Sequence, residues 1–305
     1  MIMKIRLEYV LLPAVWLFAL RAAAEPGAPE TGFNAGVGYR YDSNVNIAET
    51  DASTGKADSA LLLNLGLDGT LPLGNALSIW LGYDYASTAY RTYSDFDLGV
   101  HHARVGIRYK FAGFDSAVSF DQIKALVDGE RFLDVRQASP SLSRMIGDRL
   151  YLRGSYTRAE KTFAGNGERN AFNDALHADA YILIDGMQQY IALGYRMDSE
   201  NAAGSEFDYD GSAARIAYGH AMDAGRMTLR LKMHLQFENR DYANITESIG
   251  APRSDRRFRT GVNAAIPISQ YFSLNGEVTR ADHVSNLDAA DFDEIVYTLN
   301  VSADF

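Results

Sequence analysis

The sequence predicts an all-β protein, a transmembrane, antiparallel, up-and-down β-barrel of about 14 strands with short periplasmic turns and longer extracellular loops. Three observations predict this fold. Apolar and polar residues alternate along most of the chain after residue 32, as in strands with one apolar and one polar face. Tight turns and longer polar loops alternate between these segments. The polar faces carry many charges, which a dry core does not accommodate.

Residues 1–24 have the layout of a secretory signal peptide, and the predicted outer-membrane barrel domain follows at 25–305. A basic start precedes an apolar stretch, 9–20, and three small residues, 22–24, form the exit. An uncleaved anchor helix is the alternative, but the apolar stretch is too short to span a bilayer. We expect cleavage after Ala24.

Fourteen segments alternate, and each is expected to be a strand. They are 32–42, 56–71, 75–87, 96–111, 113–125, 131–142, 148–159, 171–184, 187–199, 206–221, 225–240, 255–267, 269–283 and 291–305. The clearest runs from Met227 to Phe237, where Met, Leu and Phe alternate with Thr, Arg, Lys, His and Gln. All fourteen segments exceed the about 5–6 residues usual in soluble strands. They suit a tilted membrane strand, which needs about 9–11 residues.

The connections between these segments alternate in length. The tight ones are 72–75, 112–113, 143–147, 185–186, 223–225 and 267–270, and the others are 43–55, 87–95, 128–130, 163–170, 201–205, 241–253 and 284–291. Outer-membrane barrels have short turns on the periplasmic side and longer loops outside. This architecture indicates the bacterial outer membrane as the location of the protein. An even strand count then places both termini on the periplasmic side. A soluble periplasmic β-protein is the alternative.

Composition excludes several classes of protein. The chain has 305 residues, 47% hydrophobic, with no Cys and a net charge of -10. The lack of Cys excludes disulfide frameworks, thiolate metal sites and thiol nucleophiles. The acidic balance argues against nucleic acid as a partner. Asp- and Asn-rich segments lack the spacing of a calcium loop and are interpreted as solvated turns. We expect no metal and no cofactor.

The inward polar faces gather basic residues from neighbouring strands. The first cluster comprises Arg215, Arg230, Lys232, His234, Arg257 and Arg259; the second comprises His102, Arg104, Arg108 and Lys110. Inward acids include Asp68, Asp84, Asp115, Asp121, Asp179 and Glu277. Such a lumen either selects a polar solute through a transverse field or is a charge-paired wall that maintains the barrel. Loops 43–55 and 241–253 are the candidate plugs.

Residues at the end of the chain resemble the terminal strand of bacterial outer-membrane proteins. They are Tyr297, Leu299, Val301 and Phe305. In those families this strand is recognised by the barrel-assembly machinery. Further stretches resemble, in the right order, the barrel domain of the surface lipoprotein assembly modifier family and its porin-like relatives. They are Gly38–Asn46, Leu126–Phe132, Glu206–Gly211, and Ser285–Leu287 followed by Asp291–Asp293.

That resemblance implies a fourteen-stranded barrel that works in transport or translocation across the outer membrane. Its partners would be outer-membrane lipid, the barrel-assembly machinery through the C-terminal strand, and a lipoprotein or secreted client. The family's N-terminal tetratricopeptide domain is expected to be missing, because the first strand closely follows the predicted cleavage site. The alternatives are a passive porin-like channel for small polar solutes and a structural or adhesive barrel acting through its extracellular loops.

One pattern raises the question of catalysis. His283-Val284-Ser285-Asn286 resembles the His-x-Ser-Asn motif of outer-membrane phospholipases, and residues two apart on a strand share a face. The glycine that follows in that family is Leu287 in this chain, and the parity of the strand directs His283 inward, away from lipid. We therefore expect no enzymatic activity.

Overall fold

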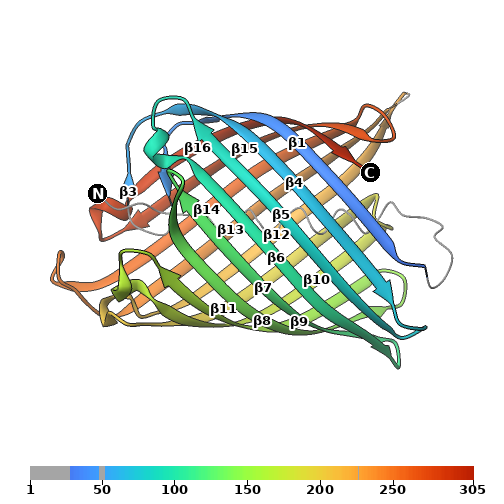
Figure 1. The fold of residues 1–305 in the computed structure, drawn as a ribbon, viewed down its shortest axis with the longest axis horizontal. Coiled ribbons are helices and arrows are strands. Elements are labelled where there is room, and N and C mark those ends of the chain that lie inside the picture. Colours follow the sequence, from blue (N-terminus) through green and yellow to red (C-terminus); the bar gives the residue numbers. More distant parts are fainter. Residues whose placement is uncertain (1–27, 48–51, 226) are drawn as a thin grey trace.

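A computed structural model describes residues 28–47, 52–225 and 227–305, so the predicted signal peptide lies outside the described residues. Fourteen strands form a closed barrel in which each strand pairs antiparallel with its neighbours along the chain, and β1 pairs with β16 to complete the ring. Figure 1 shows the strands tilted across the long axis, with the C-terminus at the end where the short turns lie. The prediction of an up-and-down barrel is confirmed.

The barrel strands are 13 to 20 residues long, and β13 is the longest. They are β1 Glu30–Asp42, β4 Asp58–Pro72, β5 Leu77–Tyr90, β6 Leu98–Phe111, β7 Phe114–Val127, β8 Glu130–Ile146, β9 Leu150–Phe163, β10 Ala171–Asp185, β11 Gln189–Ala202, β12 Tyr209–Ala224, β13 Met227–Thr246, β14 Ala251–Pro267, β15 Phe272–Ser285 and β16 Phe292–Asp304. Two short strands, β2 Asn46–Ile47 and β3 Ala52–Ser53, form a separate sheet. Each segment expected to be a strand is one, with shifted ends.

The largest difference from the sequence prediction lies between β13 and β14. The expected long loop 241–253 is mostly strand, because pairing resumes between Ile245 and Pro252 after a register shift. Only 247–250 separate the two strands. This segment extends the β13–β14 hairpin past its neighbours (Figure 1), so the expectation that it folds inward as a plug is wrong.

Local backbone chemistry explains the tightest connections. At Ala112-Gly113 and Asp128-Gly129 both residues have positive φ, between 48° and 79°. Two-residue hairpins with positive φ at both positions match the twist of the flanking strands, and Asp-Gly suits them well. The turn at 128–129 therefore joins β7 to β8 directly, although it lies on the loop side of the barrel.

Several longer loops share one construction. Each contains a short 3-10 turn: η4 Ser94–Phe96, η5 Gly167–Arg169, η6 Ser205–Phe207 and η7 Asp288–Ala290. In three of them the next residue accepts a hydrogen bond from the backbone N–H of the preceding strand: Asp97 from Tyr90 at 2.6 Å, Asn170 from Phe163 at 2.7 Å, and Asp208 from Ala202 at 2.7 Å. These Asx side chains fix the loops to the rim of the barrel.

The two faces of the wall differ as the alternation predicts. On β6, Val105, Ile107 and Tyr109 are 46%, 52% and 49% exposed on the outer face. Arg104 and Arg108, at the alternate positions, lie on the inner face. Rows of exposed apolar side chains around a closed barrel are what a lipid-facing surface requires. No helix within the described residues is long and apolar enough to cross a bilayer.

Candidate functional site: the charged lumen and its mouth

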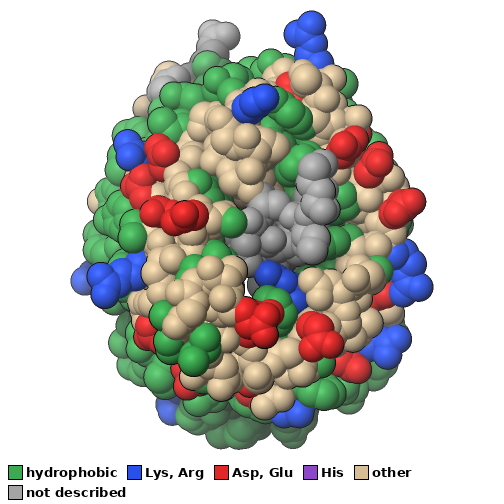
Figure 2. Space-filling view, turned by 90° about the vertical axis from the view of Figure 1, so that its left-hand side faces the viewer, with side chains coloured by type: hydrophobic (Ala, Val, Ile, Leu, Met, Phe, Trp, Pro, Cys, Tyr) green, Lys and Arg blue, Asp and Glu red, His purple; other side chains and the backbone are tan. Residues whose placement is uncertain are grey.

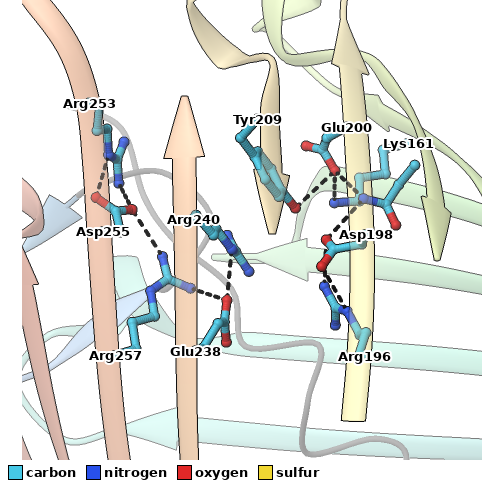
Figure 3. Close-up of polar contacts among 11 residues, drawn as sticks. Lys161, Arg196, Asp198, Glu200, Tyr209, Glu238, Arg240, Arg253, Asp255 and Arg257 are labelled. Atoms are coloured by element: carbon cyan, nitrogen blue, oxygen red, sulfur yellow. Dashed lines mark hydrogen bonds and ion pairs between the residues drawn. The ribbon is translucent and has the colours of Figure 1, made fainter. Parts of the chain in front are cut away.

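A network of ion pairs lines the loop-side half of the inner wall, and we call it the charge belt (Figure 3). Its residues are Lys161, Arg196, Asp198, Glu200, Tyr209, Glu238, Arg240, Arg253, Asp255 and Arg257. On β11, Arg196 holds Asp198 with two hydrogen bonds of 3.1 and 2.7 Å. Glu200, two residues further, accepts from Lys161 of β9 at 2.5 Å. The belt thus connects strands that are not neighbours in the barrel.

The second half of the belt is more deeply buried. Glu238 of β13 is 4% exposed, and its Oε1 lies 2.7 Å from Arg240 Nε and 3.5 Å from Arg257 Nη1. Arg257 also reaches Asp255 Oδ2 at 3.7 Å, and Arg253 binds the same carboxylate with contacts of 2.8 and 2.7 Å. Charges this buried are tolerated because each has an opposite partner.

The structure brings five of the first predicted basic cluster together and separates the sixth. Arg215 and Arg259 flank Gln236 on the neighbouring strands, and His234 and Lys232 follow along β13 towards the turn side. Arg257 belongs instead to the charge belt. The cluster is not purely basic, because Arg215 Nη2 lies 3.3 Å from Asp179 Oδ1.

Glycines let the side chains of this wall lie flat. A Cβ placed at Gly261 would lie 2.4 Å from His234 Cε1, and one at Gly82 would lie 2.4 Å from Arg104 Nε. Contacts that short are impossible, so only glycine allows the neighbouring side chain to cross it. Polar side chains are thereby held against the wall and away from the middle of the lumen.

The second predicted cluster lies on β6, on the opposite side of the barrel from β13 in the strand order. It comprises His102, Arg104, Arg108 and Lys110, all on the inner face. His102 and Arg104 each contact an acidic side chain. His102 Nε2 lies 2.8 Å from Asp121 Oδ1, and Arg104 Nη2 lies 2.9 Å from Asp84 Oδ2. Much of this second cluster is a charge-paired wall.

The loop between β1 and β4 folds over the loop-side opening as a small hairpin, the mouth hairpin, residues 44–56. Its tip, 48–51, lies outside the described residues. Asn44 fixes its base: Oδ1 accepts from Ser53 Oγ at 2.6 Å and from the Gly55 N–H at 2.9 Å, and Nδ2 donates to the Asp293 carbonyl at 3.2 Å. This hairpin agrees with the expectation that segment 43–55 folds inward.

Apolar side chains of the mouth hairpin enter a buried cluster on the inner wall. Val45 is 0% and Ile47 3% exposed. We call the wall part of this cluster the apolar collar: Ala60, Tyr90, Val100, Ile123, Ala125, Leu133, Val135, Ala159 and Phe163, from β4 to β9. Phe96 of the next loop completes the cluster. The hairpin is thus held by polar bonds on the β1–β16 side and by apolar packing against the collar.

The terminal residues close the barrel at the turn end. The expected signature residues, Tyr297, Leu299, Val301 and Phe305, all lie exposed on the outer face. Phe305 exchanges backbone hydrogen bonds of 3.1 and 2.9 Å with Phe33, and its ring stacks on Tyr271 at 5.3 Å between centroids. The last aromatic residue therefore contributes to both the seam and the aromatic girdle on this side.

The His-x-Ser pattern is part of the wall. His283 is 4% exposed and stacks on the Phe292 ring, with centroids 4.4 Å apart. Ser285 Oγ donates its hydrogen to Asp255 Oδ1 at 2.7 Å, so this hydroxyl is not activated by His283. In the described part of the chain, no three His, Asp or Glu side chains are grouped so that they could hold a metal ion.

The charge belt was missed in the sequence, although a signal for it exists. Oppositely charged residues recur two positions apart on strands, where they share a face. Such pairs are Arg40–Asp42, Arg196–Asp198, Glu238–Arg240, Arg253–Asp255 and Arg280–Asp282. The first four face inward. The sequence alone does not show which strands bring such pairs together around the ring.

The family-like stretches of the sequence converge on the mouth. Gly38–Asn46 supplies the base of the mouth hairpin, and Asp291–Asp293 supplies an acceptor for it. Leu126–Phe132 adjoins the apolar collar, where Val127 and Phe132 pack. A family model described as surface lipoprotein assembly modifier matches residues 32–271. This chain belongs to the surface lipoprotein assembly modifier family.

Solved structures similar to this family member are outer-membrane proteins. The anion-selective porin from Comamonas acidovorans has a TM-score of 0.55 at 9% identity, covering 91% of this chain and 99% of that chain. Vibrio cholerae OmpT folded in vitro has 0.52 at 9%, covering 94% and 99%, and Salmonella typhi OmpF with daunomycin has 0.52 at 8%, covering 91% and 97%. These likenesses show the porin-like barrel fold. No curated protein matches the sequence.

Proposed function

We propose that this barrel is a gated conduit for transport or translocation across the bacterial outer membrane. The observation that carries the proposal is the mouth hairpin, because it lies over one end of a charged lumen and is not part of the barrel sheet. A hairpin that can move aside suits a polar passage that opens when a cargo arrives.

This geometry favours the conduit over the two alternatives. A passive porin for small polar solutes works without a separately held hairpin at its mouth, whereas Val45 and Ile47 hold one against the inner wall of this barrel. A purely adhesive barrel needs loops that present a surface and has no use for an internal hairpin. Membership of the surface lipoprotein assembly modifier family supports a lipoprotein or secreted protein as the cargo.

The charges suggest how a cargo would pass. Figure 2 shows Asp and Glu side chains spread around the loop-side rim, and exposed acids such as Asp95, Glu168 and Glu247 lie in these loops. Within the lumen, Arg230 and Lys232 stand on one wall opposite the basic residues of β6. We assign both basic clusters to the wall of the passage, where they line the route of the cargo and have no catalytic role.

Orientation and assembly complete the proposal. The start of β1 and the end of β16 lie on the side of the short turns (Figure 1). This side is periplasmic in outer-membrane barrels. We expect N-terminal sequencing of the membrane-extracted protein to begin at Glu25, and a retained Met1 would contradict this. The exposed terminal aromatic, Phe305, suits recognition by the barrel-assembly machinery.

Single-channel recording tests the gate. The wild-type barrel in a planar bilayer should be mostly closed, and a variant with residues 45–55 replaced by a short Gly-Ser linker should conduct steadily. A matched control replaces the turn 247–250 in the same way and should behave as the wild type. Equal, steady conductance of all three proteins would indicate a passive porin, and heat-modifiable barrels that never conduct would exclude a conduit.

A further inference from the structure

The apolar collar is an unusual surface for the inside of a polar lumen. Its nine residues run across six consecutive strands at the loop end, next to the strongly charged belt. Apolar area of this extent facing water is unfavourable, so a partner that covers it is stabilised there. In this structure the partner is a segment of the same chain, Val45–Ile47, together with Phe96.

The mode of binding is that of an extended peptide. Val45 and Ile47 are two residues apart, so both side chains of the extended segment enter the collar. Asn46, between them, points to the other side and donates through Nδ2 to Glu294 Oε2. The backbone of Val45 pairs with the returning arm, donating to the Lys56 carbonyl at 2.9 Å and accepting from the Thr54 N–H at 3.0 Å. Recognition therefore combines two aliphatic side chains with one polar contact.

The hairpin is held by few bonds compared with a barrel strand. Strands β2 and β3 share two residue pairs, Asn46 with Ser53 and Ile47 with Ala52, and neither strand belongs to the barrel sheet. On its other side, the hairpin and residues 288–293 together line a polar pocket of about 550 Å³, next to the bond from Asn44 to the Asp293 carbonyl. One face is therefore dry and the other borders an open, polar space, so the hairpin can leave without breaking any barrel pairing.

We propose that the apolar collar is a binding site for extended peptide segments with aliphatic side chains at alternate positions, and that Val45–Ile47 occupies it as an internal competitor. The inference rests on the proposed function, because the cargo of a protein conduit would supply such a segment at the mouth. A cargo segment with two β-branched residues two apart and a polar residue between them displaces the hairpin and opens the passage.

The binding site can be tested without measuring transport. A barrel with residues 45–55 replaced by a Gly-Ser linker is folded in detergent, checked by heat-modifiable migration, and titrated with a fluorescent peptide of residues 43–57. The control peptide carries Val45→Ser and Ile47→Ser. Anisotropy should rise to saturation with the native peptide, and the control should bind at least tenfold more weakly. Equal binding of the two peptides, or no binding of either, would overturn the proposal.

A second variant locates the site and covers poor folding of the first. In the full-length chain, Val45→Ser with Ile47→Ser empties the collar and keeps the loop, so the native peptide should bind it. Adding Val135→Asn, inside the collar, should abolish that binding. If the peptide still binds, the site lies elsewhere and the inference fails. Conductance is recorded in parallel. If the barrel binds the peptide but never conducts, the result contradicts the proposed conduit function and still supports the peptide-binding site.

Discussion

Glu238→Gln is the sharpest test of the charge belt. The carboxylate lies on the inner wall between Arg240 at 2.7 Å and Arg257 at 3.5 Å, and Glu238 is 4% exposed. Glutamine has the same shape, so packing is preserved and only the charge is removed. The guanidinium groups of Arg240 and Arg257, whose side chains are 13% and 11% exposed, then face each other without the carboxylate that neutralised both.

The magnitude follows from these distances. At an effective dielectric constant of about 20, unit charges 2.7 and 3.5 Å apart attract by roughly 6 and 5 kcal/mol. Desolvation of the three groups cancels much of this gross attraction. Breaking a buried pair by removing one partner costs about 3–5 kcal/mol, because the remaining charge is left uncompensated. We expect Glu238→Gln to lower the free energy of unfolding by about 3 kcal/mol, the lower end of that range, since the amide oxygen keeps a partial negative charge beside the two guanidinium groups.

Urea unfolding of the barrel in detergent, followed by the fluorescence of Trp80, measures this loss. Asp174→Asn is the matched control, because Arg158 Nη1 lies 2.8 Å from Asp174 Oδ2 on the outer face, where the side chains are 54% and 40% exposed. Exposed pairs contribute little, so this variant should unfold close to the wild type. Equal losses in the two variants would refute the view that the belt is a buried, mutually dependent network.

Three further predictions concern the wall, the passage and assembly. Leu235→Arg on the outer face should destabilise the barrel by about 2–4 kcal/mol, whereas Gln236→Glu, which places a carboxylate between Arg215 and Arg259 on the lumen side, should be tolerated; heat-modifiable migration compares the two variants, and equal tolerance would contradict the assigned faces. Arg230→Ser with Lys232→Ser should shift the reversal potential of the hairpin-deleted channel towards cations, and an unchanged potential would make these residues wall structure alone. Phe305→Ala should reduce insertion in cells more than folding in detergent, and equal effects would argue against recognition of the terminal residue.

Much of the fold follows from the sequence because each barrel strand repeats one simple pattern. Alternation along Met227–Phe237 is enough to place a strand and to assign its faces, since the period of two is a property of the local backbone. The end of β13 was missed because the alternation breaks where the register shifts between Asp241 and Ile245. A local pattern cannot show that pairing resumes after a shift, because resumption depends on the partner strand.

The candidate site depends on contacts between distant residues, and these were less predictable. The basic character of β13 is visible in the sequence. Whether Arg257 joins an ion-pair network instead depends on where Glu238 and Asp255 lie around the ring. Segment 43–55 was expected to fold inward as one of two loops that carry Asp and Glu. Its two aliphatic residues, Val45 and Ile47, are too few to form a periodic signal, so their binding surface could not be predicted.

The position of the mouth hairpin has a consequence for the timing of folding. Its base follows β1, and its acceptors, the Asp293 carbonyl and Glu294, lie on β16. These two strands are the first and the last of the barrel, and they meet only when the ring closes. Contacts between such distant parts of a chain form late. The hairpin is therefore positioned by closure of the ring, so an incompletely assembled barrel lacks a fixed hairpin at its mouth and acquires one only when β1 and β16 pair.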